Sequence, residues 1–418
     1  MPKVLTILCT VLLATAPLLG QGTQPLAIRG VDVLDLDTES LARDRTLIVR
    51  AGRIEAVAAP GEITPPAGAF AIDGRGLVAV PGLHDMHVHV ESGAFAAALG
   101  LSATTAIDHE AALVAYLANG ITTIQVCSGA PDLLELRDAI AAGEIVGPRL
   151  VVGSPMLAGD PPILPPPVTR VAPTADEAVS AVRELHEQGY DFVKLRENVP
   201  ADAFFALVAE ARQLGVRVAG HVPRGEGLSL EGVLATGSYG VLHLDELIGP
   251  EPHTEDRIEA IASLVQKHGG EVVTTLTVMA NLVDKLNDYD ATLAQPEMRY
   301  MHPLLKGLWL NNPFREPATP ERRAQLEAWL ANEERLLVAL VERGATVLAG
   351  TDALNPTIVP GFSLHGELNL MVDAGLSPAQ ALRAATVIPA RFLAGSERAG
   401  RIEAGAPADF VLVGRSPL

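Results

Sequence analysis

The middle of the chain alternates short apolar segments with longer helical patterns, and this alternation constrains the fold most. Eight apolar segments are strand candidates, at 83–90, 121–126, 150–153, 192–195, 216–219, 241–244, 272–276 and 346–349. Helix-like segments lie between them, at 108–118, 175–188, 201–214, 256–268 and 320–342. Strands that alternate with helices form parallel sheets. Eight such units predict an α/β fold, a TIM-type (β/α)8 barrel over residues 81–395.

The two ends of the chain have a different pattern. Residues 23–80 hold four short strand-like runs broken by glycine and proline, and residues 396–418 hold two more around a turn. Neither end has a long helical pattern. We therefore predict that the two ends close one small sheet domain beside the barrel.

Residues 1–22 have the pattern of an export signal. Lys3 precedes an apolar run at 4–19, and small residues follow at 20–22. The run is short for a membrane span, so we expect a cleaved signal and an exported protein, periplasmic or secreted, with no membrane anchor. Cleavage would leave Cys127 as the only cysteine, which excludes an internal disulfide.

The charge of the chain excludes one class of partner. The formal net charge is −19, and no basic patch is visible in the sequence. Binding to a polyanion needs clustered positive charge, so we expect no nucleic-acid partner. A small-molecule substrate is the expected partner, and the sequence is compatible with a homo-oligomer.

His87 and His89 lie two positions apart in the first strand candidate. Side chains alternate along a strand, so both imidazoles point to the same side. In a buried strand they would need a shared partner, and a metal ion is the usual one. The alternative is a pair of ordinary strand histidines.

Lys194 ends the fourth strand candidate and shares a face with Phe192. Burial lowers the pKa of a lysine towards the neutral amine. A neutral amine can react with carbon dioxide, and the resulting carbamate is an anionic ligand able to bridge two cations. The alternative is an ordinary lysine whose ammonium group reaches water or an acid.

Three more strand ends carry metal-ligand residue types, namely His221, His243 and Asp352. Singly, each histidine could be a hydrogen-bonded core residue, and the aspartate could cap a turn. Jointly, all six residues fall at strand ends that one barrel would bring together, which predicts a metal site. Nitrogen and oxygen ligands suit zinc, with manganese, iron or cobalt also allowed.

Two loops are candidate lids over the carboxyl ends of the strands. One is the proline-rich stretch 161–173, and the other is the long insertion 279–320. Both loops suggest a partly hydrophobic pocket. The alternative is that they are surface loops without a role at the site. Candidate substrate anchors are Arg196, Arg224, Tyr300 and Arg315, and candidate supporting residues near the site are His109, His365 and Glu367.

Several motifs together resemble the amidohydrolase superfamily of metal-dependent hydrolases. They are PGLHDMHVH at 81–89, DFVK at 191–194, the strand-end His221 and His243, AGTD at 349–352, GLSPAQAL at 375–382, AAT at 384–386 and GRIEAGAPADF at 400–410. The resemblance covers nearly the whole chain after the signal. It implies a (β/α)8 barrel with a small composite β-sandwich built from 23–80 and 396–418. His84 departs from the family pattern, where an apolar residue is usual, and we interpret it as structural.

Carried over by residue, the resemblance implies two divalent metal ions. His87, His89 and Asp352 would bind the first ion, His221 and His243 the second, and carboxylated Lys194 would bridge them. This is similar to the imidodipeptidase-like, two-metal branch. The implied mechanism uses a metal-bridging hydroxide, with Asp352 as the catalytic residue that carries a proton to the leaving nitrogen. The implied reaction is hydrolysis of a C–N amide bond in a dipeptide or N-acyl amino acid.

Two alternatives stay open. One is a single-metal deaminase, or a cyclic-imide or lactone hydrolase, of the same fold in which Lys194 is unmodified. The other is a non-catalytic carrier of a metal or ligand. A carrier does not need a positioned proton acceptor, so the presence of Asp352 argues against it.

Overall fold

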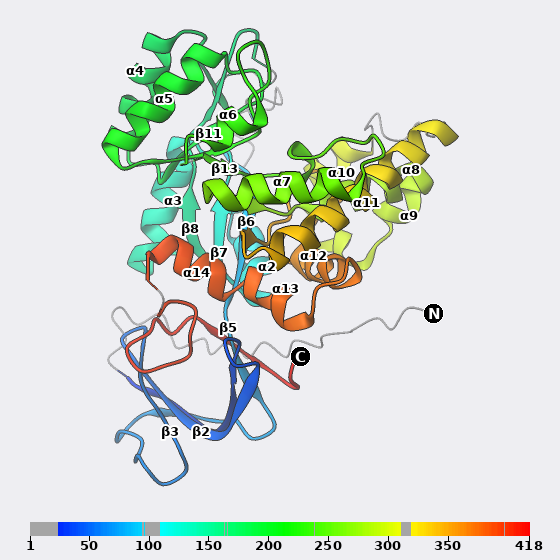
Figure 1. The fold of residues 1–418 in the computed structure, drawn as a ribbon. Helices are drawn as coiled ribbons and strands as arrows, with labels where there is room; N and C mark the ends of the chain where they lie inside the picture. The colour runs from blue at the N-terminus through cyan, green and yellow to red at the C-terminus, as the bar shows by residue number, and fades with distance from the viewer. Residues whose placement is uncertain are drawn as a thin grey trace.

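The chain is described by a computed structural model that covers residues 24–93, 96, 109–162, 164, 166–237, 239–310, 319–396 and 398–418. These residues form an α/β fold with two parallel sheets and one separate mixed sheet (Figure 1). The predicted export signal at 1–22 lies outside them. Among the helices of these ranges, none has the length and apolar character needed to cross a bilayer.

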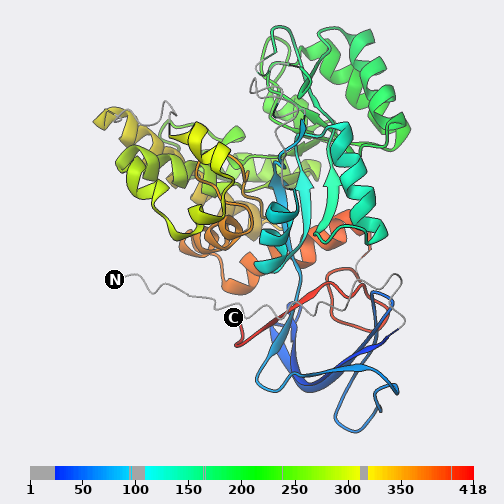
Figure 2. The same ribbon diagram turned by 180° about the vertical axis from the view of Figure 1, so that it is seen from behind.

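The separate sheet joins the two ends of the chain. Its six strands run in the order β16-β5-β1-β2-β3, with β4 parallel to β1, and β16 pairs antiparallel with β5. Figure 2 shows the first and last segments side by side below the larger part of the molecule. The strands are β1 (Leu26–Asp35), β2 (Ser40–Arg50), β3 (Arg53–Ala58), β4 (Phe70–Asp73), β5 (Val78–Pro81) and β16 (Phe410–Val413). The shared sheet agrees with the sequence, whereas the two-sheet sandwich and the boundary at 80/81 stay predictions.

Eight of the ten parallel strands overlap the eight strand candidates of the middle region, and β9 and β10 are additional. A three-stranded sheet has the order β6-β7-β8, and a seven-stranded sheet has the order β10-β9-β11-β12-β13-β14-β15. The strands are β6 (Leu83–Val88), β7 (Ile121–Val126), β8 (Arg149–Val152), β9 (Met156–Ala158), β10 (Thr169–Val171), β11 (Phe192–Leu195), β12 (Arg217–Gly220), β13 (Tyr239–Val241), β14 (Glu271–Val273) and β15 (Thr346–Leu348).

Two details differ from the sequence prediction. The strand expected at 272–276 ends at Val273, because Thr275 takes a left-handed backbone conformation with φ 51° and helix α8 (Leu276–Asn287) begins immediately after it. Strand β9 precedes the proline-rich stretch 161–173, and β10 lies inside this stretch, which we expected to be a loop throughout. They pair with each other in parallel, and β9 contacts β11 at Leu157 and Leu195.

Contacts outside the regular ladders connect the two parallel sheets. Gly153, just after β8, forms a parallel bridge with Phe192 of β11. On the other side, Met86 N–H donates to the carbonyl of Ala349 at 2.9 Å, and Val88 bridges to Ala353. One buried cluster draws a side chain from seven strands or the residues just after them, namely Met86, Cys127, Phe192, Ala219, Leu242, Val273 and Leu348.

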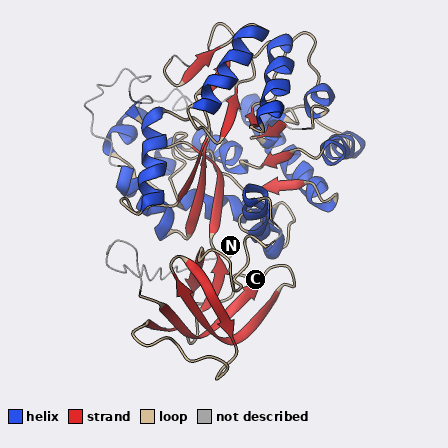
Figure 3. Cartoon of the chain, turned by 90° about the vertical axis from the view of Figure 1, so that its left-hand side faces the viewer, coloured by secondary structure: helices blue, strands red, loops and turns tan. Residues whose placement is uncertain are grey.

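Helices cover the outer faces of the parallel strands (Figure 3). Helix α4 begins at a capping box in which Thr174 and Glu177 bond each other's backbone, and its buried face carries Val182 and Leu185. Helix α5 ends at Gly215, whose φ of 70° suits a residue without Cβ. The helices are α2 (His109–Ala118), α3 (Pro131–Ala142), α4 (Ala175–Glu187), α5 (Ala201–Leu214), α6 (Leu230–Leu234), α7 (Glu255–His268), α8 (Leu276–Asn287), α9 (Tyr289–Leu293), α10 (Pro303–Trp309), α11 (Pro320–Glu342), α12 (Phe362–Asp373), α13 (Pro378–Ala384) and α14 (Val387–Ala394), with 3-10 turns η1 (Leu244–Glu246) and η2 (Pro296–Tyr300).

Asp37, in the turn between β1 and β2, joins the mixed sheet to the helical part. Its carboxylate accepts hydrogen bonds from Arg383 at 2.8 Å, Arg391 at 2.6 Å and Arg401 at 2.5 Å. Burial opposes ionisation of this carboxyl, but the three arginines outweigh burial and lower the pKa of Asp37 to about 2. The charged form is therefore stabilised by folding.

Asp37→Asn is expected to lower the free energy of unfolding at neutral pH by roughly 2 kcal/mol, since each pKa unit corresponds to about 1.4 kcal/mol. The folded pKa lies below the unfolded value, so this stabilisation is present above about pH 4 and disappears as the pH falls towards 2. Urea unfolding of both proteins across this range measures it. Asp138→Asn, at a side chain 71% exposed, serves as the control without effect. If the difference in the free energy of unfolding between wild type and Asp37→Asn did not become smaller in acid, the lowered pKa of Asp37 would not be its cause.

Candidate metal centre

The six residues predicted as metal ligands line one cavity of about 550 Å³. His87 belongs to β6 and Lys194 to β11. The other four lie just after the carboxyl ends of strands, namely His89 after β6, His221 after β12, His243 after β13 and Asp352 after β15. The parallel arrangement places these strand ends together, as expected.

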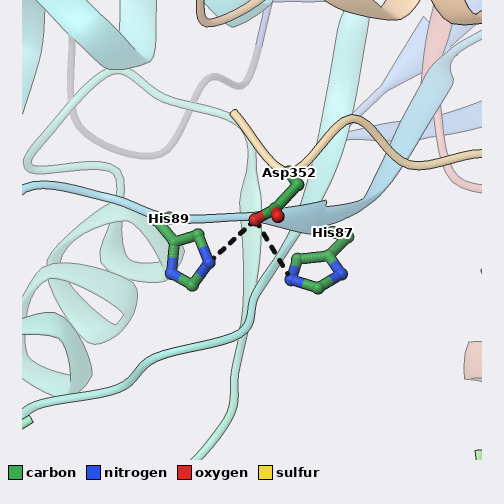
Figure 4. Close-up of side chains that lie close together, drawn as sticks. All are labelled: His87, His89 and Asp352. Carbon is green, nitrogen blue, oxygen red and sulfur yellow. Dashed lines mark ion pairs between the residues drawn. The ribbon is translucent and has the colours of Figure 1, made fainter. Parts of the chain in front are cut away.

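Three of the six converge most closely. His87, His89 and Asp352 each offer a ligand atom, and these atoms lie within 4.8 Å of one another. Oδ1 of Asp352 is 2.9 Å from Nε2 of His89 and 3.4 Å from Nε2 of His87 (Figure 4). Among the described residues, these three form the one group of histidine, cysteine or acidic side chains whose ligand atoms lie close enough together to hold a metal ion.

The orientation of the His87 ring is fixed by a backbone carbonyl. Nδ1 of His87 lies 2.9 Å from the carbonyl oxygen of Leu242. A carbonyl only accepts, so Nδ1 carries the hydrogen and Nε2 presents its lone pair towards Asp352. Burial lowers the pKa of His87 well below its usual range, so the ring is neutral. A neutral imidazole with Nε2 open is the form that binds a metal.

The position of Asp352 is fixed by its backbone and by Asn355. Its φ of 57° is unusual for a residue with a side chain, and its N–H donates to the carbonyl of His87 at 2.7 Å. Asp85 accepts hydrogen bonds from Thr351 N–H at 3.0 Å and Thr351 Oγ1 at 2.7 Å. Asn355 Nδ2 donates to Oδ2 of Asp352 at 2.5 Å, which leaves Oδ1 for the histidines.

Two buried polar atoms at the centre, Nε2 of His87 and Nζ of Lys194, have no hydrogen-bond partner within the described part of the chain. Oδ1 of Asp352 faces the Nε2 atoms of His89 and His87, at 2.9 and 3.4 Å. Unpaired buried polar atoms are costly, and a cation would satisfy the imidazole and carboxylate atoms. The residues present therefore fit a divalent metal at this position.

Lys194 is almost completely buried, with 1% of its surface exposed. Burial lowers the pKa of its ammonium group below the usual range. This favours the neutral amine, which is the form that reacts with carbon dioxide.

His221 and His243 lie beside the first group but bind other residues. The rings of His87 and His243 are 4.4 Å apart, and those of His243 and His221 are 4.7 Å apart. Nδ1 of His243 contacts Thr275 Oγ1 at 3.1 Å. Both ring nitrogens of His221 are engaged, at 2.8 Å each, by Glu246 and Arg196.

The predicted substrate anchors have different locations. Arg196 lines the cavity, whereas Arg224 is absent from the described lining and donates to Glu246 at 2.8 Å. Tyr300 is 55% exposed and stacks on Phe362 with ring centres 5.1 Å apart. The Arg315 position and the side chain of His109 lie outside the described residues.

The three remaining histidine and glutamate predictions are accounted for by other contacts. His84 is buried, and its Nδ1 contacts the carbonyl of Gly82 at 3.2 Å. Nε2 of His365 contacts the carbonyl of Asn119 at 3.1 Å. Glu367 binds the start of helix α8, which follows β14.

Sequence patterns missed several polar residues of the site. Asp245 lines the cavity, and burial, followed by the charges of Glu246 and Asp352, raises its pKa to about 7. Asp245 and Glu246 follow His243 directly, so their place after a strand end was an available signal. Asn355 and Asp85 had no such signal, because their contacts depend on loop conformation and on another strand.

The remaining wall of the cavity is mostly apolar. The proline-rich stretch contributes Leu164, and the 279–320 insertion contributes Leu305 and Trp309. Both loops predicted as lids therefore supply side chains to the cavity. The other apolar lining residues are Met156, Val168, Val278, Leu354 and Pro356.

Comparisons with known proteins agree with this geometry. The sequence profile of the amidohydrolase family matches residues 78–417. The fold is similar to that of a prolidase candidate from Bifidobacterium longum, with a TM-score of 0.72, 24% identity, and coverage of 95% of this chain and 90% of that one. It is also similar to a bottromycin amidohydrolase, with a TM-score of 0.70, 25% identity, and coverage of 94% and 82%.

A curated relative matches a shorter segment. Adenine deaminase 2 from Bradyrhizobium sp. (strain ORS 278) is 37% identical over 94 residues, which are 21% of this chain and 16% of the deaminase. The chain therefore spans only a small part of that relative's length.

Proposed function

This chain belongs to the amidohydrolase family and is a metal-dependent hydrolase of carbon–nitrogen bonds, and we propose that it hydrolyses the amide bond of a dipeptide or an N-acyl amino acid. The observation that carries the proposal is the convergence of His87, His89 and Asp352 in a cavity with a largely apolar wall. The names of the two similar structures, a prolidase candidate and a bottromycin amidohydrolase, are compatible with hydrolysis of an amide bond.

The proposed centre holds two divalent ions, with zinc as the expected metal. His87, His89 and Asp352 would hold the first ion, and His221 and His243 the second, with a carboxylated Lys194 between them. When bound, such ions polarise a scissile carbonyl and activate water for attack. The unpaired Lys194 Nζ and its lowered pKa support carboxylation of this residue.

The protein's own groups supply the proton transfer and the dry environment. Asp352 Oδ1 takes a proton from the attacking water and delivers it to the leaving nitrogen, while Asn355 holds Oδ2 in place. Leu305 and Trp309 keep bulk water from the apolar side of the substrate. Arg196, a cation in the same cavity, is the proposed anchor for a substrate carboxylate once its guanidinium has left His221.

A deaminase is the second candidate, and the local identity to an adenine deaminase favours it. A deaminase also hydrolyses a carbon–nitrogen bond, but its leaving group is ammonia. Turnover of adenine with release of ammonia, and none of dipeptides or N-acyl amino acids, would select it.

Two structural proposals accompany the function. We infer that the two parallel sheets form one closed (β/α)8 barrel, supported by the bridges from Gly153 to Phe192 and from Val88 to Ala353. We also infer that the mixed sheet belongs to a β-sandwich domain. The export signal at 1–22 would place the enzyme in the periplasm or outside the cell, and the mass of the mature secreted chain tests this.

Treatment with a chelator is expected to lower amide hydrolysis at least about 100-fold, and zinc is expected to restore it, since metal-activated water drives this chemistry. Lys194→Ala is expected to lose the same activity, measured with a panel of dipeptides and N-acyl amino acids. Lys267→Ala, at an exposed side chain, is the matched control. Full activity of Lys194→Ala with one metal per chain would overturn the two-metal proposal.

A further inference from the structure

Arg196 binds the nitrogen of His221 that the second metal ion would need as a ligand. One of its terminal nitrogens, Nη1, lies 2.8 Å from Nε2 of His221. A guanidinium only donates hydrogen bonds, so Nε2 of His221 is the accepting, unprotonated nitrogen. The opposite nitrogen, Nδ1, lies 2.8 Å from Glu246 Oε1 and donates its hydrogen to that carboxylate. Nε2 is thus the nitrogen of His221 that could bind a metal ion, and Arg196 already binds it.

The position of Arg196 is itself fixed. Its second terminal nitrogen, Nη2, donates to Glu197 Oε1 at 2.9 Å, and the side chain is only 18% exposed. Arg196 follows β11 and lines the cavity together with Lys194. The guanidinium is a cation, so it also repels a metal ion that approaches His221 and His243.

The first metal position has no such competitor. Nε2 of His87 is buried without a hydrogen-bond partner among the described residues, and Oδ1 of Asp352 lies 2.9 Å from Nε2 of His89, which is itself a predicted ligand. The other polar atoms of these side chains are held by Leu242 and Asn355, which aims the open atoms at each other. The two metal positions therefore differ before any ion binds, because a ligand nitrogen of the second position is already bound by an arginine, whereas Nε2 of His87 in the first position is not.

We propose that Arg196 keeps the second metal position closed, so that the two ions bind in order. The first ion binds to His87, His89 and Asp352, and the second must displace the guanidinium from Nε2 of His221. This inference rests on the proposed two-metal centre and adds a residue that sets the affinity of one ion independently of the other.

Metal titration of chelator-stripped protein tests the proposal. Calorimetry with zinc, and the visible spectrum with cobalt, are expected to resolve two binding steps in the wild type. Arg196→Met removes the charge and the donors but keeps much of the volume. We expect its second step to become about tenfold tighter or more, the range seen when groups next to metal ligands are changed, with the first step unaltered.

Arg224→Met is the matched control, because Arg224 contacts Glu246, the carboxylate that binds His221, but does not contact His221 itself. It is expected to bind both ions as the wild type does. If the wild type binds one ion only, gain of a second ion in Arg196→Met supports the proposal. Equal affinities in the wild type, or an unchanged second step in Arg196→Met, would overturn it.

The same titrations separate this inference from the proposed function. Ordered binding that depends on Arg196, in a chain that hydrolyses no amide of the panel, would remove the proposed function and keep the inference. Amide hydrolysis by a chain whose second step ignores Arg196 would do the reverse. Thermal unfolding of each variant shows whether it is folded.

Discussion

Asp352→Asn is expected to lower kcat/KM for amide hydrolysis at least about 1000-fold, because an amide cannot accept the proton that the carboxylate carries. The substitution keeps the shape of the side chain, including the oxygen that binds Asn355 at 2.5 Å. The backbone contact from Asp352 N–H to His87 is also preserved. Steady-state kinetics of the zinc-loaded variant, with metal content measured on the same sample, give the result.

A control shows whether the effect is specific to this carboxylate. Asp256→Asn removes an exposed carboxylate in the first turn of α7 and is expected to leave kcat/KM unchanged. If Asp352→Asn holds its metal and keeps more than about a tenth of the wild-type kcat/KM, Asp352 is not the proton carrier. In that case the carrier would be sought at Asp245, the other acidic residue among the described lining of the cavity.

Glu367→Ala is expected to have the largest effect on stability, about 3 to 5 kcal/mol in the free energy of unfolding, since it leaves several buried donors unpaired. Glu367 is fully buried in α12 and accepts from Leu276 N–H at 3.0 Å and Thr277 N–H at 2.7 Å. It also accepts from the hydroxyls of Thr274 and Thr277. One side chain thus satisfies the start of helix α8 and the residues just after β14.

Denaturant unfolding at neutral pH measures this loss. Glu259→Ala, which breaks a half-exposed ion pair with Arg343, is the matched control and is expected to cost less than about 1 kcal/mol. Glu367→Gln retains one accepting oxygen and is expected to fall between Glu367→Ala and the wild type. An alanine variant as stable as the Glu259 control would show that water replaces the lost carboxylate.

The sequence predicts the elements well where the signal is local. Helix α5 has the predicted bounds, 201–214, because Pro200 precedes its first turn and Gly215 ends it. The two-residue spacing of His87 and His89 brought both to the same cavity. The pairing of β9 with β10 could not be predicted from the sequence, because pairing across a loop leaves no periodic pattern in either segment.

The sequence predicts which six residues gather in one cavity but not how their side chains are arranged there. Strand ends identify Lys194 and Asp352 because parallel strands meet at one edge. The left-handed backbone at Asp352, and the contact between Arg196 and His221, depend on loop conformation and on neighbours distant in sequence. The position of Tyr300 was equally unpredictable, since an aromatic side chain in an insertion can face either the cavity or the solvent, and that of Tyr300 is exposed.

The antiparallel pairing of β16 with β5 also has a consequence for biosynthesis. Val80 pairs with Val411, so β5, which leads directly into β6, obtains one of its neighbours from a segment that is translated long after it. Before those residues are made, one edge of β5 is open, and an open edge recruits other strands. A chain that lacked β16 would therefore keep this edge exposed. Pairing between β5 and β16 thus makes closure of the mixed sheet depend on synthesis of the whole segment between them.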